Sequence, residues 1–565
     1  MISELNPGII LIVGALLIPF LSGVVRSIYM LALPVVAFVH VLGLPMGELG
    51  QIQLFEVTLI TLRVDKLSLV FGYIFLIATL LGTIYALHVG DWLQHTTGLI
   101  YAGSAVGAVF AGDLITLFVF WELTAIASVF LIWASRTERA YYSGLRYLII
   151  QIGSGVILLA GILIYYREAG SIAFNAIGIE TLAGQIILIA FGIKCAFPLL
   201  HNWLQDSYPE ATVSGTVMLS AFTTKLAVYA LARGYAGTDI LVPIGATMTA
   251  FPIFYAVIEN DLRRVLAYSL NNQLGFMVVG IGIGTELSLN GTAAHAFCHI
   301  IYKALLFMSM GAVLHRVGTV KGSELGGLYR SMPWTTGFCI VGAASISAFP
   351  LFSGFVSKSL IMSAALKGEY FWTWLVLLFA SAGVFHHSGI KIPYFAFFAH
   401  DSGKRCKEAP LNMLIAMGIA AGLCIGIGVY SDALYAILPY EMNYVPYTLE
   451  HVVTQLQLLI FSALAFTVLM RTGIYPPELK STNLDTDWFY RKLGYNFAAT
   501  VMLLVNQAWS SISAAVASLS SRAERFLNDH HSTDSILGRT WPTGTMAFWA
   551  TIMLGGYLVL FYFRG

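Results

Sequence analysis

Charged residues are scarce in this sequence, and their scarcity decides the class of protein. Asp, Glu, Lys and Arg make up only 10% of the 565 residues, while 58% are hydrophobic. A typical soluble domain carries about 25% charged residues, and no compact globule of this size could hide so much apolar surface from water. With a mean hydropathy of +0.79, the sequence predicts a polytopic membrane protein.

The sequence also lacks the patterns of several other classes. Its formal net charge is +1, so it has no strongly basic surface of the kind that binds nucleic acid, and we expect no nucleic-acid partner. The five cysteines show no CxxC or CxxH spacing, which argues against zinc and iron–sulfur sites. They are Cys195, Cys298, Cys339, Cys406 and Cys424. We expect no cofactor and no bound metal.

Long apolar runs are abundant, and they set the fold class. A helix needs roughly 20 apolar residues to cross the hydrocarbon core of a bilayer. That length predicts an all-α fold of about sixteen transmembrane helices, near residues 8–25, 28–46, 66–88, 97–112, 113–134, 143–166, 182–203, 211–232, 241–258, 263–284, 290–315, 334–364, 371–399, 411–431, 453–470 and 543–562.

The loops between these spans carry unequal numbers of Lys and Arg. With the N-terminus placed outside, the inside loops up to the fourteenth span hold twelve of these residues, and the outside loops hold five. Cytoplasmic loops of membrane proteins are enriched in Lys and Arg. The bias therefore predicts this orientation.

Residues 490–527 form a stretch that is apolar on one side only. Apolar residues recur at intervals of three or four, with serine, asparagine and glutamine between them, at Phe497, Val501, Val505, Ala508, Ile512, Val516, Leu519, Ala523 and Phe526. This pattern predicts an amphipathic helix on a surface of lipid headgroups or neighbouring subunits. The alternative is an ordinary seventeenth span.

Six charged residues fall inside the apolar spans. A charge at mid-bilayer costs about 3 kcal/mol on insertion scales, so such residues persist mainly where they have a function. They are Glu122, Lys194, Lys225, Lys303, Lys358 and Lys391, with His295, His299, His386 and His387 beside them. A static ion pair between two helices would explain two such charges, but not a set of six.

Two of the lysines lie beside predicted helix breaks. Proline removes a backbone hydrogen bond and clashes with the carbonyl four residues earlier, and Pro198 lies four residues after Lys194. Pro350 and Gly354 precede Lys358 and predict a second break. The fragment Phe-Pro-Leu stands at both breaks, 152 residues apart. Interrupted spans in the two halves of a chain are typical of internally repeated transporters.

Three ionisable residues share one face of a predicted helix. His295, His299 and Lys303 are spaced i, i+4 and i+8, which places them in one row. Two histidines four residues apart could ligate a metal, but no third ligand lies nearby. Imidazole exchanges protons near neutral pH, so proton exchange suits the row better. A similar cluster precedes Pro393 and contains His386, His387 and Lys391.

At these residues the sequence resembles the antiporter-like membrane proteins shared by respiratory complex I, membrane-bound hydrogenases and multisubunit Mrp-type cation/proton antiporters. The matching stretches are FVFWELTAIAS, GIKCAFPLLHNWLQDSYPEAT, ENDLRRVLAYSLNNQLGFM, HAFCHIIYKALLFM and SAFPLFSGFVSKSLI. The later stretches GIKIPYFAFF and LDTDWFYRK look most like the D-type component of Mrp antiporters. A surface helix followed by a final span is more similar to the largest component of complex I or of the Mrp antiporters.

The resemblance implies two inverted five-helix repeats, each with a broken helix that carries Lys194 or Lys358. We therefore expect six segments along the chain. They are N-terminal transmembrane helices at 1–96, the first antiporter-like repeat at 97–232, the second at 241–399, C-terminal transmembrane helices at 411–484, the lateral amphipathic helix at 485–530 and a final span at 543–562.

The resemblance also implies roles for individual residues. In the order of the chain, the matches are the family's glutamate at Glu122, its partner lysine at Lys194, a central-axis lysine at Lys225, the central histidines at His295 and His299, a second central-axis lysine at Lys303, the terminal lysine at Lys358 and the lysine of the D-type component at Lys391.

Together with these buried residues, the resemblance implies a subunit of a multisubunit complex that moves protons through a buried Glu/Lys/His relay, coupled to counter-movement of Na⁺ or another monovalent cation. The alternative is a proton-pumping or energy-coupling membrane subunit of a complex I-like, hydrogenase-like or inorganic-carbon-uptake complex, within a redox-driven translocase. A purely structural scaffold would have no use for six buried charges. The expected partners are other membrane subunits and lipid, and the expected location is the bacterial inner membrane.

Overall fold

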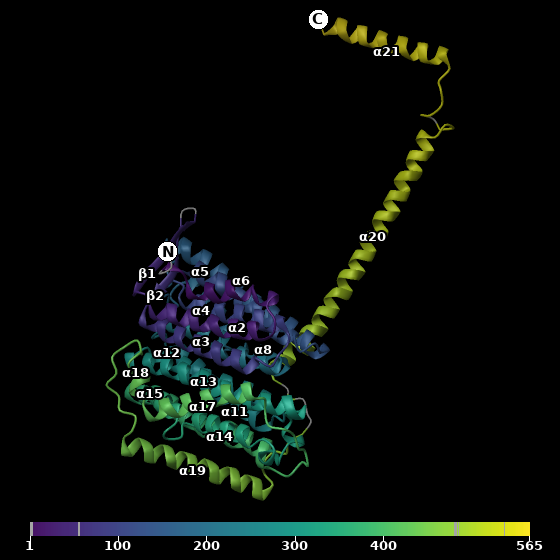
Figure 1. Ribbon diagram of the computed structural model, residues 1–565. Coiled ribbons are helices and arrows are strands. Elements are labelled where there is room, and N and C mark those ends of the chain that lie inside the picture. The colour runs from purple at the N-terminus through teal and green to yellow at the C-terminus, as the bar shows by residue number, and fades with distance from the viewer. Residues whose placement is uncertain (1–3, 55–56, 480–482, 484, 536, 565) are drawn as a thin grey trace. The chain divides into compact units, whose positions relative to one another are not determined.

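The computed structural model describes residues 4–54, 57–479, 483, 485–535 and 537–564. The chain divides into two units, Met1–Asn483 and Leu484–Gly565. In the first unit, helices lie side by side as roughly parallel rods (Figure 1). The purple and blue helices of the N-terminal half form one part of this unit, and the teal and green helices form the other.

The first half begins with two helices and a hairpin. Its elements are α1 Pro7–Ala15, α2 Gly23–Leu42, β1 Gly47–Leu54, β2 Val57–Val64, α3 Lys66–Ala86, α4 Trp92–Val109, α5 Leu114–Trp133, α6 Glu138–Ala169, α7 Leu182–Lys194, α8 Asn202–Ser207, α9 Val213–Ala221 and α10 Thr223–Gly234. The antiparallel pair β1–β2, with Gly47 opposite Val64, departs from the all-α expectation. Its second strand, VTLITLRV, is rich in the β-branched residues that favour strands.

The second half of the first unit contains no β-strand among its described residues. It contains α11 Leu241–Ile258, α12 Leu262–Ile283, α13 Glu286–Val317, α14 Pro333–Ile346, α15 Ser353–Lys367, α16 Phe371–Val384, two π-helical turns at Phe385–Lys391 and Tyr394–Phe398, α17 Leu411–Val429, α18 Asp432–Tyr435 and α19 Leu449–Thr472. Helix α13 packs against α9, α12, α14, α15 and α17, which makes it the central element.

Fewer continuous spans are present than the sequence predicted. Among the described residues, twelve helices are long and apolar enough to cross a membrane by length and composition, and two shorter apolar helices lie at Pro7–Phe20 and Leu182–Lys194. Three of the sixteen predicted runs are interrupted, and two more, α4 and α12, are continuous helices that are not among the twelve. The twelve in turn include the stretch Phe489–His531. The run at 182–203 ends as a helix at Lys194, and the run at 334–364 is divided between α14 and α15.

The two breaks have the same backbone. Ala196 and Leu199 after α7 have φ of 61° and 70°, and Ala348 and Leu351 after α14 have φ of 57° and 73°. Non-glycine residues rarely adopt this left-handed region, yet both breaks adopt it twice, in the same fragment Ala-Phe-Pro-Leu. This is what an internal repeat predicts, and the repeat boundaries themselves stay a prediction.

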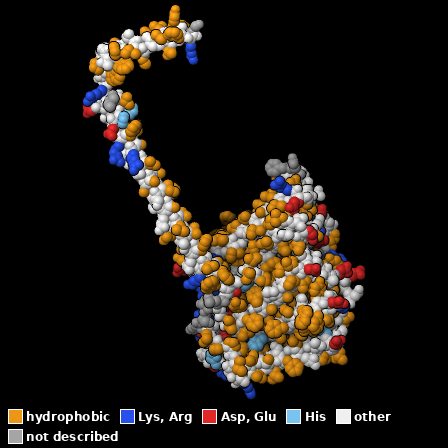
Figure 2. Space-filling view, turned by 180° about the vertical axis from the view of Figure 1, so that it is seen from behind, with side chains coloured by type: hydrophobic (Ala, Val, Ile, Leu, Met, Phe, Trp, Pro, Cys, Tyr) orange, Lys and Arg blue, Asp and Glu red, His pale blue; other side chains and the backbone are white. Residues whose placement is uncertain are grey.

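The surface of the first unit matches a lipid environment. Figure 2 shows hydrophobic side chains over the middle of the visible face, with charged side chains toward its edges. Many large apolar residues of its helices are exposed, among them Val119 on α5, Ile149 on α6 and Phe254 on α11. Exposed apolar area of this extent needs a cover of lipid or protein.

The second unit contains two long helices, α20 Tyr495–His531 and α21 Thr543–Phe563. Helix α20 is a single helix of 37 residues, as the periodic pattern predicted, and none of its residues is buried within the described part of the chain. Its placement along neighbouring subunits or across the bilayer stays a prediction.

Candidate functional site

Lys194 is the last residue of α7 and lies at the first helix break. Its side chain is fully buried, and its Nζ donates hydrogen bonds to the Trp121 carbonyl at 2.5 Å and to Thr124 Oγ1 at 2.9 Å. The ammonium also lies 4.2 Å from the centroid of the Trp121 ring, a cation–π distance. One turn of α5 therefore holds this charge.

Glu122 belongs to that same turn of α5. It is half-buried, and the two charges are near enough to interact electrostatically. Within the described ranges, however, the structure has no Glu122–Lys194 ion pair shorter than 4 Å, and Glu122 Oε1 is buried without a hydrogen-bond partner. The carboxylate lies against Gly155 of α6, where an added Cβ would overlap Oε1. Glu122 and Lys194 are thus neighbours rather than an ion pair. The Lys194 ammonium donates to Trp121 and Thr124, which precede and follow Glu122 in the chain.

Lys225 lies just after a helix break that the sequence did not predict. Helix α9 ends at Ala221 and α10 begins at Thr223. The Lys225 ammonium donates to the Ser220 carbonyl at 2.6 Å, near the end of α9 where carbonyls lose their helical partners. The break therefore gives the buried Lys225 ammonium a backbone acceptor.

The row on α13 is buried in the centre of the unit. The His295 ring nitrogens lie 3.2 Å from Ser357 Oγ and 3.1 Å from Gln273 Oε1, and the rings of His295 and His299 are stacked 6.1 Å apart. Both His299 nitrogens and the Lys303 Nζ are buried without a partner among the residues that the structure describes. Such polar groups are commonly satisfied by internal water.

Lys358 connects this row to a cavity. Its Nζ donates to the Ile346 carbonyl at 3.2 Å and lies 5.0 Å from the Phe276 ring centroid. A cavity of about 270 Å³ between α15, α16 and α19 reaches Lys358 and is also lined by Glu450, His451 and Gln455. In the predicted orientation α19 begins outside, so this cavity opens toward the outer face.

The histidines near Pro393 lie in the π-helical turn Phe385–Lys391. His386 stacks on the Tyr475 ring at 5.4 Å, and the Nδ1 of the buried His387 lies 2.9 Å from Ser388 Oγ. Ser388 in turn donates to Ser269 Oγ on α12 at 2.7 Å. His387 is therefore buried beside a hydroxyl pair, whereas His386 packs among aromatic rings.

Lys391 is held by acceptors that the sequence did not reveal. Its Nζ donates to the carbonyls of Val257 and Glu259 at 2.6 and 2.7 Å and to that of Ala256 at 3.2 Å, and it lies 3.0 Å from Glu478 Oε1. Burial raises the pKa of the Glu478 carboxyl, and the Lys391 charge offsets part of that rise. Glu478 follows α19 in a loop, where no apolar run marked it as unusual.

The predicted site residues are buried in the first unit, apart from Glu122 and His386, which are partly exposed. The rings of His295 and His299 stack 6.1 Å apart, and His387 and Lys391 belong to one π-helical turn. Sequence reasoning missed Gln273, Ser357, Glu478 and the cavity residues Glu450 and His451, because only their position against the lysines distinguishes them. Such a series can pass a proton between groups that each accept and donate it.

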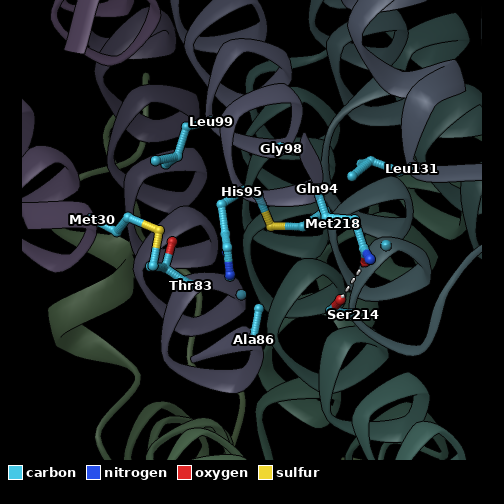
Figure 3. A pocket seen from close by; sticks show the side chains of 12 residues that line it. Met30, Thr83, Ala86, Gln94, His95, Gly98, Leu99, Leu131, Ser214 and Met218 are labelled. Carbon is cyan, nitrogen blue, oxygen red and sulfur yellow. Dashed lines mark hydrogen bonds between the residues drawn. The ribbon is translucent and has the colours of Figure 1, made fainter. Parts of the chain in front are cut away.

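A small cavity on α3, α4 and α9 lies apart from this set. It holds about 20 Å³, room for a single water. Figure 3 shows His95, Met30 and Met218 around it and the hydrogen bond from Ser214 to Gln94, which measures 3.3 Å. No predicted site residue lines it. In the described part of the chain, no group of three or more His, Cys, Asp or Glu is arranged to hold a metal ion.

Comparison with known proteins identifies the class. Residues 111–385 match the family described as the transmembrane region of NADH:quinone oxidoreductase and Mrp antiporter proteins. The A-type component of the Na⁺/H⁺ antiporter of Alkalihalophilus pseudofirmus is 29% identical over 76% of this chain and 61% of its own length. The D-type component from the same organism is 32% identical over 47% of this chain and 58% of its length.

Residues 111–385 of this multi-pass membrane protein therefore belong to this family. The chain spans about three fifths of the length of these curated relatives.

Solved structures share the fold. The Mrp complex from Dietzia sp. DQ12-45-1b contains a chain with a TM-score of 0.66 and 21% identity, covering 76% of this chain and 91% of that one. A chain of the membrane-bound sulfane sulfur reductase, an archaeal respiratory membrane complex, reaches 0.69 at 21% identity and covers 98% and 99%. At this identity the likeness concerns the fold alone.

Proposed function

We propose that the chain is the proton-translocating subunit of a multisubunit Na⁺/H⁺ antiporter in a bacterial cell membrane. The observation that supports this is the set of buried lysines and histidines from Lys194 to Lys391. A charge in a membrane interior is costly, so it is retained mainly where it is paired or has a function. The Lys303 ammonium has no hydrogen-bond or ion-pair partner among the described residues and only approaches the Phe307 ring, at 6.0 Å from its centroid. Static pairing therefore does not account for the set.

In this proposal each part of the set has one task. The neighbours Glu122 and Lys194 take up the proton, because a charge on one changes the affinity of the other for a proton. Lys225, His295, His299 and Lys303 carry protons along the central axis. Lys358, with its cavity, and the pair His387–Lys391 release protons or pass them to another subunit, while His386 supports this end by packing.

A second candidate is an energy-coupling subunit of a respiratory complex, in which the redox chemistry of other subunits drives proton flow. The specific observation in its favour is the fold likeness to a chain of the sulfane sulfur reductase complex over 98% of this chain. Both candidates use the same buried residues. They differ in partners, so the proteins that co-purify in mild detergent distinguish an antiporter complex from a redox complex.

The test uses the intact complex in vesicles with a pH-sensitive dye. Glu122→Gln keeps the side-chain shape and removes the charge, so we expect proton flux to be nearly abolished while insertion and assembly persist. Lys194→Ala should have the same effect, and the double variant should be about as inactive as either single one, because the residues act as a unit. Near-normal flux in assembled Glu122→Gln complexes would make this pair structural.

A further inference from the structure

The Lys391 ammonium lies in a cage of four oxygen atoms. Three are the carbonyl oxygens of Ala256, Val257 and Glu259, and the fourth is Glu478 Oε1, at distances between 2.6 and 3.2 Å. The carbonyls come from the last turn of α11 and the residue that caps it. At this end of a helix the carbonyls lack intrahelical partners and carry negative partial charge.

Oxygen atoms of these types are the usual ligands of a hard monovalent cation. Backbone carbonyls and a carboxylate bind hard cations in proteins, and rings of carbonyls replace the hydration shell of K⁺ in channels. The lysine ammonium is itself a compact point charge on a flexible stem. In this structure the cage therefore holds a cation that belongs to the chain itself, the Lys391 ammonium.

Glu478 makes the cage depend on a cation. The side chain of Glu478 is only 6% exposed and that of Lys391 is not exposed at all. Within the described residues neither Glu478 oxygen accepts a hydrogen bond of normal geometry. A buried carboxylate without a counter-charge is strongly destabilising. If the lysine side chain moves away, either another cation or a proton must neutralise the carboxylate.

The backbone that carries Lys391 can accommodate such a movement. Lys391 is the last residue of a π-helical turn, and π-helical turns insert an extra residue into a helix, often at functional sites. Pro393 follows two residues later and has no N–H to continue the helical pattern. A shift of this turn toward α-helical geometry would rotate Lys391 around the helix axis, away from α11.

We propose that this oxygen cage is a binding site for a dehydrated monovalent cation, Na⁺ or K⁺, and that the Lys391 ammonium is its resident competitor. The proposal rests on the proposed transport function and gives its cation a location. The cage holds one positive charge at a time, so the cation and the ammonium exchange one for one. The site lies at the inner end of α11 in the predicted orientation.

The test is equilibrium cation binding to the purified full chain. Lys391→Met keeps the apolar stem and removes the charge, so Na⁺ or the K⁺ analogue Rb⁺ should stabilise this variant against heating, with N-methylglucamine as the inert cation. We expect half-maximal stabilisation at about tenfold lower concentration than in the wild type, where the ammonium competes. Glu478→Gln combined with Lys391→Met should lose the response. Lys367→Met, at an exposed lysine of α15, is the matched control.

If Lys391→Met does not fold in inert salt, the proposal predicts that Na⁺ or Rb⁺ restores folding and N-methylglucamine does not. Equal effects of all three salts on Lys391→Met would overturn the cation site and leave Lys391 as a fixed cap of α11. Because binding is measured without flux, this result is separate from the proposed function. Loss of proton flux in Glu122→Gln tests that function alone.

Discussion

The Lys358 ammonium donates a hydrogen bond to the carbonyl of Ile346, which stands 152 residues after Lys194. The same offset relates the two Ala-Phe-Pro-Leu breaks and their left-handed residues. Lys194 therefore belongs to the helix that ends at its break, whereas Lys358 belongs to the helix that follows its break and reaches back. The two halves bring an ammonium to equivalent breaks from opposite sides.

A second correspondence joins α6 and α13. Both helices have 32 residues, and α13 begins and ends 148 residues after α6 begins and ends. At this offset Gly155 corresponds to Lys303, and Gln151 corresponds to His299. The Glu122 carboxylate lies against Gly155, so the first half places its charge where the second half carries a lysine. Equivalent positions thus hold charges of opposite sign from different helices.

Gly155 should be as important as Glu122. In Gly155→Ala the new Cβ would overlap Glu122 Oε1, so the carboxylate must leave its place. We expect this substitution to lower proton flux nearly as much as Glu122→Gln. Gly153→Ala, on the same helix with nothing within 4 Å of the added Cβ, should keep normal flux. Equal flux in both alanine variants would show that the carboxylate position does not matter.

The cavity beside Lys358 should be required for transport. Ser363 lines it together with Lys358, so Ser363→Phe fills space near the ammonium while Ser363→Ala enlarges it slightly. If protons or water reach Lys358 through this cavity, the phenylalanine variant should lose most of its proton flux, and the alanine variant should retain it. Complex assembly, measured by size-exclusion chromatography, should be normal in both. Full flux with phenylalanine would assign the route elsewhere.

Much of the candidate site could be predicted because membranes make charges conspicuous. Glu122 and the buried lysines are ionisable residues in apolar runs, and Pro198 and Pro350 mark the breaks through a lost backbone hydrogen bond. The family membership expected from the motifs is confirmed by the match over residues 111–385. These signals are local, so one sequence contains them.

The remainder depends on contacts between distant segments. The break at Phe222 has neither proline nor glycine in SAFTTK, so no local signal in the sequence marks it. Glu478 is ordinary in sequence and becomes notable only because its loop approaches α11 and Lys391. The apolar runs, taken separately, also cannot show that Lys194 donates to Trp121 and Thr124 instead of forming an ion pair with Glu122. Such relationships arise from tertiary structure.

The pair Arg233–Asp65 should stabilise the first unit in a pH-dependent way. Arg233 on α10 donates to both Asp65 oxygens, at 2.8 and 2.9 Å, and so ties this helix to the N-cap of α3. Burial alone would raise the pKa of Asp65, but the hydrogen bond and charge of Arg233 hold that pKa below its usual value. Arg233→Gln should cost about 2 kcal/mol of stability at neutral pH.

The sign of this pH dependence follows from the lowered pKa. Asp65 stabilises the fold where it is charged, above its pKa in the unfolded chain, and this contribution is lost as the pH falls through the lower folded-state pKa. Melting curves of the purified wild type and Arg233→Gln should therefore differ by a constant amount near pH 7 and converge below about pH 4. The control adds Asp65→Asn to both proteins. The melting curves with and without Arg233→Gln should then no longer differ at any pH.

Helix α20 should hold the complex together through its apolar stripe. None of its residues is buried within the described part of the second unit, and the stripe includes Val505, Ala508 and Ile512 at helical spacing. An apolar stripe of this length is stable only against lipid or protein. Ile512→Lys places a charge in the stripe, whereas Ser510→Lys places the same charge on the opposite side of the helix.

We expect the first variant to yield dissociated subunits and little proton flux after mild-detergent purification, and the second to yield intact, active complexes. Dissociation of both variants would indicate a general sensitivity of α20 to charge, and intact complexes from Ile512→Lys would show that the stripe does not contact other subunits.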